Sequence, residues 1–479
     1  MGNFNSLEIG KRGLLASQFG LDVTSNNIAN VNTPGYSRRM TSLIQSDPLH
    51  TNNGFMGTGV MADKLRSFRE DFFDNEIRST LSRKSGYDAD QEILHKIETS
   101  LAEPSDLDVA KLVNQFFNAF NEASTQPENI GMREHLLGVT QTLVDRFHNL
   151  SQKFSDIRRD TNNSLNNSTK QANTLIKQIA GLNKSIAQSY TEGSVPGQTM
   201  VDEREKLLEE LSKLMNTTIG TGENGSVNVY INGINIITGP VYSELGLQEK
   251  IDTETGERTL EIIKTDSKSM KTVLNPQAGE ITSNLKHYNI TLDENDLSGE
   301  YSPIQKLNDL ANAIVQKVNA ISLNGFGLDD TSTNSPARAI FEPSVGKASA
   351  ANIAVSKDIK GKPRNIPFSD SPKEGGNNKI ALQIARLASD PVFIDGGTPS
   401  EFYAAFIGKI GTMSQEAQSA TSTTRMVADQ LESQRQSTIG VNLDEEAINI
   451  VKFQKAFEAS SRVISITNDI LGTIINLGR

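Results

Sequence analysis

The sequence predicts a mainly α-helical, elongated fold with a smaller β part, in which the two terminal helices pair as a coiled coil and a helical bundle carries a β-hairpin. Apolar residues recur at heptad spacing at both ends of the chain, and a long apolar repeat covers residues 136–186. An Asn-Gly pair inside the alternating segment 227–237 is a strong hairpin signal. Helices precede and follow the strands, so we expect a chain that returns to pack beside its own beginning.

The first helix is expected over residues 4–30, and the segment NNIANVNTPGY at 26–36 ends it. Asparagine side chains compete for backbone hydrogen bonds, and a Pro-Gly pair cannot continue a helix. We expect Tyr36 to anchor this turn by burying its ring and bonding through its hydroxyl. The apolar stripe of the helix is Leu7, Leu14, Leu21 and Ile28, and the residues of the stop are Asn26, Asn27, Asn30, Asn32, Thr33, Pro34, Gly35 and Tyr36.

The middle of the chain is read from its periodicity and its turn residues. Residues 37–65 are expected to be strands or extended loop, and 219–300 a β region with the hairpin turn at Asn232-Gly233. Residues 324–378 are rich in Gly, Pro, Ser and Asn, which predicts a loop with little core. Further helices are expected at 68–102, about 106–120, 136–186 as one long helix or two, 202–215, 303–322, 379–390 and 400–437.

The last helix is expected from about Leu443 to the end of the chain. Asn442 suits the N-cap and Glu445 the third position of a capping box, while three acidic residues complement the helix dipole. Such a helix is marginal alone in water, so it needs partners. The acidic residues are Asp444, Glu445 and Glu446, and the apolar stripe is Leu443, Ala447, Ile450, Phe457, Ile464, Leu471 and Ile475.

Composition argues against several function classes. The net charge of −11 is unsuited to a general nucleic-acid binder, and no stretch approaches the roughly 20 apolar residues of a membrane span. The chain has no cysteine, and its five histidines show neither metal-ligand spacing nor a nucleophile partner. We therefore expect no enzyme activity, no cofactor, no metal, and neither nucleic acid nor membrane as a partner. We also find no signal peptide at the N-terminus.

Three segments carry a resemblance to a known family. NNIANVNTPGYSRR resembles the N-terminal signature of flagellar rod, hook and hook-associated proteins, and GVNLDEEAINIVKFQKAFEASSRVIS, from Gly440, resembles their C-terminal signature. Residues 97–134 resemble a segment of the first hook–filament junction proteins, the FlgK type. An enzyme, a hook or rod protein, and an extracellular coiled-coil adhesin are the alternatives. Residues 97–134 argue against the hook or rod protein, and an adhesin would not need the paired terminal signatures.

The resemblance implies a structural subunit of the bacterial flagellum that self-assembles into the junction ring connecting hook to filament. It implies about eleven copies per ring, the hook protein and a second junction protein as neighbours, and a chaperone of the FlgN type at the C-terminal helix. It also implies an extracellular location on the flagellum, reached through flagellar type III export without a cleaved signal peptide. The expected domains are 1–45 with 441–479 (D0), 46–325 with 377–440 (D1), and a loop-rich connector at 326–376 in place of a large outer domain.

Overall fold

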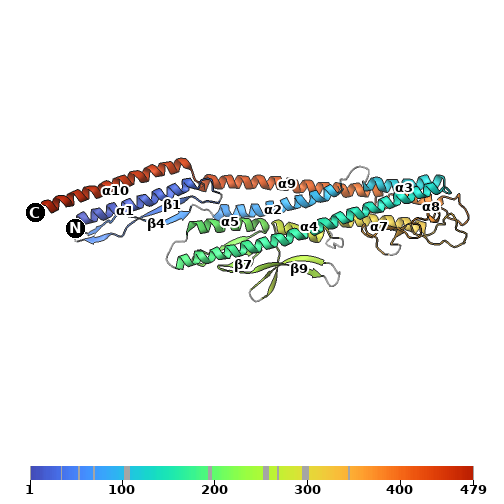
Figure 1. Ribbon diagram of the computed structural model, residues 1–479, viewed down its shortest axis with the longest axis horizontal. Coiled ribbons are helices and arrows are strands. Elements are labelled where there is room, and N and C mark those ends of the chain that lie inside the picture. The colour runs from blue at the N-terminus through green and yellow to red at the C-terminus, as the bar shows by residue number, and fades with distance from the viewer. Residues whose placement is uncertain are drawn as a thin grey trace.

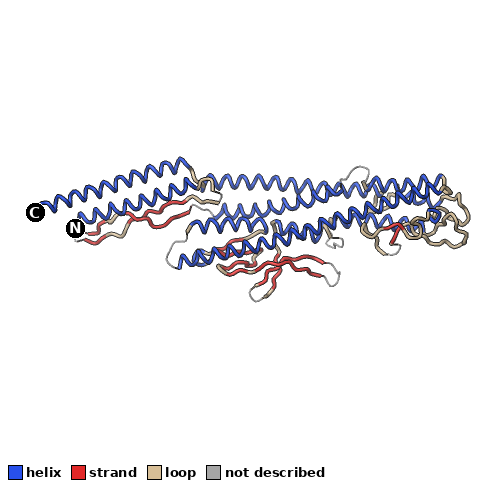
Figure 2. Tube along the Cα trace, viewed as in Figure 1, coloured by secondary structure: helices blue, strands red, loops and turns tan. Residues whose placement is uncertain are grey.

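The chain forms a long rod with both termini at the same end (Figure 1). The computed structural model describes residues 2–33, 35–51, 54–67, 71–101, 108–191, 197–251, 258–266, 269–293, 301–343 and 346–477. Helices run along the whole rod, whereas strands lie beside α1, along the middle of the rod and, as a short pair, near the end away from the termini (Figure 2). The mainly α-helical, elongated fold with a smaller β part is therefore confirmed.

The end of the rod that holds both termini is called the axial part below. It contains α1 and α10, which lie side by side, and a ribbon of strands along α1 (Figure 1). Strands β1 and β4 pair antiparallel, with Ile44 opposite Met61, and the expected D0 boundary at residue 45 falls inside this ribbon. The elements are α1 (Gly2–Ala29), β1 (Arg39–Gln45), β2 (Leu49–Thr51), β3 (Gly54–Met56), β4 (Val60–Ser67) and α10 (Leu443–Leu477).

The remaining rod, residues 71–439, is called the body. Its longest element is α4, a single helix of 62 residues, so the repeat at 136–186 belongs to one helix rather than two. The repeat faces the core, since Leu143, Phe147, Leu150 and Phe154 are all fully buried. The main helices of the body are α2 (Asp71–Leu101), α3 (Val109–Thr125), α4 (Ile130–Thr191), α5 (Gln198–Leu214), α7 (Pro303–Ser322), α8 (Lys379–Arg386) and α9 (Pro399–Ile439).

The β region lies against α4 and forms two small antiparallel sheets. The predicted hairpin is present: Asn232 and Gly233 have φ of 46° and 79°, as a two-residue turn of type I′ requires. The sequence did not predict α6 (Glu280–Lys286) or the π-helical turn that follows it (His287–Thr291). The strands are β5 (Thr218–Thr221), β6 (Val227–Ile231), β7 (Ile234–Thr238), β8 (Val241–Tyr242), β9 (Glu244–Ile251), β10 (Arg258–Thr265) and β11 (Lys271–Leu274).

A buried histidine fastens α6 and the π-helical turn to α2. His287 is 3% exposed, and its Nε2 lies 3.0 Å from Oδ1 of Asp90. The hydroxyl of Ser283 also donates to Asp90. Burial raises the pKa of the Asp90 carboxyl, but the hydrogen bonds from His287 and Ser283 outweigh that effect and hold the pKa below its usual value.

Loss of this carboxylate should change the acid stability of the protein. A lowered pKa means that Asp90 stabilises the fold above its unfolded pKa of about 4, and that this stabilisation is lost as pH falls through the lower folded pKa. We expect Asp90→Asn to lower the melting temperature at pH 7, and we expect the difference in melting temperature from wild type to shrink as the pH falls below about 4. Thermal melts of the wild-type and variant proteins at pH 7 and at acid pH measure this difference. An unchanged difference would contradict an ionised Asp90.

Residues 324–378 are mostly irregular, but the prediction of little core was wrong. Phe341, Ile353, Ile366 and Phe368 are fully buried and join the same apolar core as α3, α4 and α7. Their apolar residues follow no helix or strand period, so the sequence pattern concealed them. The segment contains three short elements, β12 (Phe341–Glu342), β13 (Ala354–Val355) and a 3₁₀ turn (Pro363–Asn365).

Candidate assembly interface at the paired termini

Helices α1 and α10 pack through small residues on α1. A Cβ atom built on Gly20 would lie 2.6 Å from the ring of Phe453, and one on Gly10 would lie 2.8 Å from Cγ1 of Ile464. Position 10 therefore meets 464 and position 20 meets 453, so the two helices run antiparallel. Gly13 likewise leaves room for Ser460. The buried face of α1 is Gly10, Ala16, Ser17, Gly20, Thr24 and Asn27.

Except for Ile464, which meets Gly10, the apolar stripes predicted from heptad spacing lie beside this contact rather than at its centre. All four members of the α1 stripe, Leu7, Leu14, Leu21 and Ile28, are half-buried. On α10, Ile450, Phe457, Ile464 and Leu471 are half-buried, whereas Leu443, Ala447 and Ile475 are exposed. The antiparallel register places Ile475 beyond the start of α1, which explains its exposure. Phe453 and the three glycines were missed, although small residues three and four apart were the available signal.

Helix α10 carries a second apolar stripe, called the outer stripe, on the side away from α1. It consists of Ile448, Val451, Ile466 and Ile470, with exposed fractions of 67%, 55%, 58% and 45%. Ile448 and Ile466 are about five helical turns apart, so they point the same way. Phe453 and Ile464 point to the opposite side, toward α1. Exposed apolar side chains gathered on one face make the outer stripe a candidate for contact with another molecule.

The stop after α1 is built from the asparagines and the tyrosine that the sequence singled out. The Tyr36 hydroxyl donates to Oδ1 of Asn27 at 2.8 Å and of Asn26 at 3.1 Å. Asn27, 1% exposed, also binds the backbone of Arg39, since its Oδ1 accepts from the amide at 3.0 Å and its Nδ2 donates to the carbonyl at 2.8 Å. Burial raises the pKa of Tyr36, so its hydroxyl stays protonated as a donor.

The remaining residues of the stop are Asn30, Asn32, Thr33, Pro34 and Gly35. Asn30 donates from its side chain to the carbonyl of Asn26 at 2.9 Å, and Thr33 donates to Oδ1 of Asn30 at 3.2 Å. Gly35 has a φ of 80°, which a residue with a side chain rarely adopts. Asn32 is exposed, and Pro34 lies outside the described residues.

The stop also holds the start of α10, through a residue that the sequence analysis did not single out. The guanidinium of Arg38 contacts Oε2 of Glu445 at 2.6 Å and Oε1 of Glu446 at 2.8 Å. Burial lowers the pKa of Arg38, but its hydrogen bonds to the two carboxylates outweigh this and raise it. Asn442 caps the helix as predicted, because its Oδ1 accepts from the amide of Asp444 at 2.9 Å.

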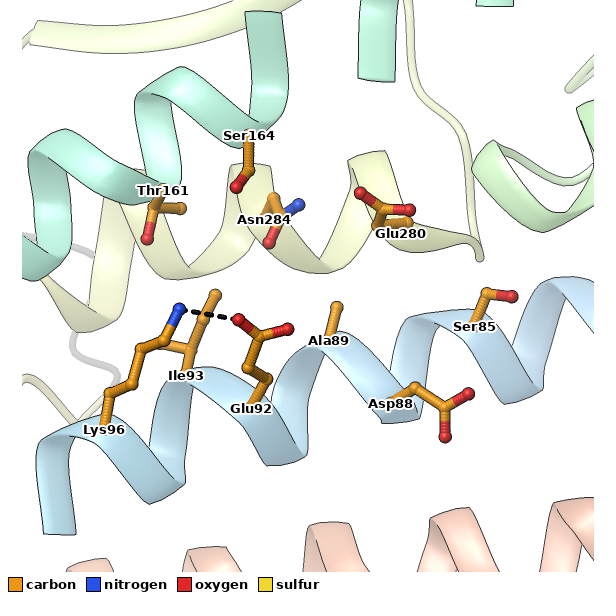
Figure 3. Close-up of a pocket in the computed structure, with 10 residues that line it drawn as sticks. All are labelled: Ser85, Asp88, Ala89, Glu92, Ile93, Lys96, Thr161, Ser164, Glu280 and Asn284. Carbon is orange, nitrogen blue, oxygen red and sulfur yellow. Dashed lines mark hydrogen bonds and ion pairs between the residues drawn. The ribbon is translucent and has the colours of Figure 1, made fainter. Parts of the chain in front are cut away.

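The body contains a polar groove (Figure 3). It has a volume of about 220 Å³ and lies between α2, α4 and α6. Its carboxylates already have partners: Lys96 contacts Glu92 at 2.6 Å, and Ser168 donates to Glu280 at 2.6 Å. The first contact lies within α2, and the second joins α4 to α6. Over the described ranges, no cluster of three or more His, Asp or Glu side chains is arranged to hold a metal ion.

Within the part of the chain that the structure describes, every helix is too short or too polar to cross a bilayer. The candidate site is the axial part, where the stop and the outer stripe of α10 lie.

Comparison with protein families identifies the body and the axial part separately. The model of the flagellar hook-associated protein FlgK helical domain matches residues 94–337, just over half of the chain. The flagella basal body rod protein model matches residues 7–36, which lie in α1 and the stop. The flagellar basal body rod FlgEFG protein C-terminal model matches residues 432–477, which include α10.

Whole-chain relatives agree with these matches. Flagellar hook-associated protein 1 of Bacillus subtilis is 26% identical and covers 99% of this chain and 98% of its own length. Its namesake in Escherichia coli is 23% identical and covers 97% and 98%. The solved structure of the flagellar hook junction protein FlgK from Burkholderia pseudomallei has the same fold, with a TM-score of 0.62, 12% identity, and coverage of 76% of this chain and 100% of that one. The chain therefore belongs to the flagellar hook-associated protein FlgK family and is a component of the bacterial flagellum.

Proposed function

We propose that this protein is a structural, non-enzymatic subunit that self-assembles through its axial part at the junction between hook and filament. The observation that carries the proposal is the outer stripe of α10. A helix with apolar residues on two opposite sides needs two neighbours, and α1 supplies only one of them. A second copy of the chain supplies the other, so that axial parts pack side by side into a ring.

Family membership supports the finer parts of the proposal. We expect a ring of about eleven copies, with the hook protein on one side and a second junction protein on the other. Before assembly the outer stripe would be exposed to solvent, and a chaperone of the FlgN type covering α10 would prevent premature association. Export through the flagellar type III route, without a cleaved signal peptide, would deliver the chain to the outside of the cell.

A hook or rod protein is the second candidate. The matches at residues 7–36 and 432–477 are to rod-protein models, so the axial part alone favours neither reading. The match to the FlgK helical domain over residues 94–337 favours the junction. The adhesin and enzyme alternatives have no comparable support.

Deletion of the gene tests the junction role directly. We expect electron micrographs of the deletion strain to show hooks without filaments, and flagellin to appear in the medium. Filaments of normal number would contradict the junction role. Absence of hooks would instead place the protein in the rod or hook.

Complementation with Ile466→Asp tests the outer stripe. A carboxylate buried against a second copy without a partner costs about 3 kcal/mol or more, which weakens association by about a hundredfold or more at each contact. We therefore expect hooks without filaments. Ser465→Asp, which adds the same charge at the exposed neighbouring position, should restore filaments. Equal filament counts with both variants would contradict contact through the outer stripe.

A further inference from the structure

Two consecutive arginines follow the stop and point to different parts of the molecule. Arg38 binds Glu445 and Glu446 on α10, within the axial part. Arg39 instead crosses to the body, where its Nη2 lies 3.2 Å from Oδ2 of Asp202 and 3.2 Å from Oγ1 of Thr199 on α5. These two adjacent residues therefore contact different parts of the molecule, Arg38 the axial part and Arg39 the body.

Arg39 is itself held firmly on the axial side. Asn27 of α1 binds both its amide and its carbonyl. Its guanidinium carbon lies 4.9 Å from the centre of the Tyr36 ring, within the range of a cation–π contact. The side chains of Arg39 and Asp202 are only 13% and 11% exposed, so their ion pair is largely shielded from water and salt. Through Asn27, the Arg39 side chain thus connects α1 to α5.

Packing between the stop and the body is incomplete on the Tyr36 side of this contact. A cavity of about 660 Å³ lies between the stop, α2, α5 and the end of α9. Its wall includes Tyr36 on the axial side and Lys206, Glu209 and Arg435 on the body side. Because the space is not filled by apolar side chains, apolar packing there does little to fix the relative orientation of the two parts.

We propose that Arg39 and Asp202 are positioning residues that set the angle between the axial part and the body, whereas Arg38 holds only the start of α10. The angle matters because α1, at 28 residues, is about 42 Å long. A rotation of about 10° at the joint would displace its far end by roughly 7 Å, more than one helical turn. The proposal concerns contacts within one chain and does not depend on the ring.

Distance measurements on the free full-length chain test the proposal. The chain has no cysteine, so Gln18→Cys on α1 and Lys184→Cys on α4 provide two unique sites for nitroxide labels. Both positions are exposed. Double electron–electron resonance then reports the distribution of distances between the axial part and the body. We expect a single narrow distribution for the otherwise unchanged chain, and at least a twofold greater width with Arg39→Gln or with Asp202→Asn.

Two controls separate this role from general destabilisation. Glu203→Gln removes an exposed carboxylate next to Asp202 on α5 and should leave the width unchanged. Arg38→Gln should leave the width unchanged but speed amide exchange at the start of α10. The Arg39→Gln/Asp202→Asn double variant should be no broader than either single variant, because both remove the same contact.

Several results would overturn the proposal. One is a broad distance distribution in the labelled chain that keeps both Arg39 and Asp202. Another is a width that stays the same in both Arg39→Gln and Asp202→Asn. A third is a broadening with Arg38→Gln as large as that with Arg39→Gln. A thermal melt of each variant by circular dichroism accompanies the measurement. Broadening that appears only in variants whose body no longer melts cooperatively would likewise overturn it.

Discussion

The Gly20→Leu variant is expected to lose junction assembly while its body melts within about 2 °C of the wild-type temperature. Even a Cβ atom at this position would lie 2.6 Å from the Phe453 ring, and a leucine adds three further carbons. Overpacking of this kind costs about 1–3 kcal/mol or more. The α1–α10 pair has few fully buried apolar residues with which to absorb that cost. The helices should therefore separate, and with them the surface presented to other copies.

Gly472→Ala is the matched control for this prediction. It also adds a side chain to a glycine of the helix pair, but nothing lies within 4 Å of the new Cβ atom. A helical Gly→Ala change is itself stabilising by roughly 0.5–1 kcal/mol, so assembly should persist. Filament counts by electron microscopy and melts by calorimetry give the two readouts. Normal filaments with Gly20→Leu would show that close contact between α1 and α10 is dispensable.

Arg133→Met is expected to lower the free energy of unfolding of the body by about 3–5 kcal/mol. Arg133 is 1% exposed and donates to three backbone carbonyls, those of Pro127 at 2.7 Å, Pro363 at 3.3 Å and Ile366 at 2.8 Å. Its guanidinium carbon also lies 4.0 Å from the centre of the Phe368 ring. Methionine fills much of the volume but leaves the carbonyls without a donor, and unpaired buried carbonyls are costly.

Urea unfolding followed by circular dichroism measures this loss. Arg159→Met is the control, since Arg159 lies on the same helix, is 69% exposed in its side chain and has a surface pairing with Asp156 at 2.9 Å. Such surface pairs contribute at most about 1 kcal/mol. Equal stability of the two variants would mean that residues 363–366 do not depend on Arg133. Burial also lowers the pKa of Arg133 to about 10, so it remains a cation at neutral pH.

Much of the fold could be predicted because periodicity and turn chemistry are local signals. The helix expected at 303–322 is α7, with the same bounds, and that at 4–30 is α1 at Gly2–Ala29. The hairpin at Asn232-Gly233 follows from two residues whose φ must be positive. Asn27 and Tyr36 could also be singled out, because an unusual polar run beside a helix end demands hydrogen-bond partners.

The rest could not be predicted because it depends on residues far apart in the sequence. Arg38 and Arg39 are two ordinary basic residues until the fold brings Glu446 and Asp202 beside them. The small-residue face of α1 was not predicted, because the heptad-spaced leucines of this helix are the stronger sequence signal. Phe341 and Phe368 lack any period, so only the surrounding helices reveal that they belong to the core. In each case a long-range contact, rather than a local preference, decides the outcome.

The pairing of the two termini has a further consequence for biosynthesis. Gly10 meets Ile464, so nearly the entire chain must exist before this contact can form. Closing so long a loop has a large entropic cost that local contacts do not offset, so we expect the α1–α10 pair to form after the local elements of the chain. A chain cut short by premature termination or proteolysis therefore cannot complete it. Only an intact subunit can therefore present the paired α1 and α10 helices to another copy of the chain.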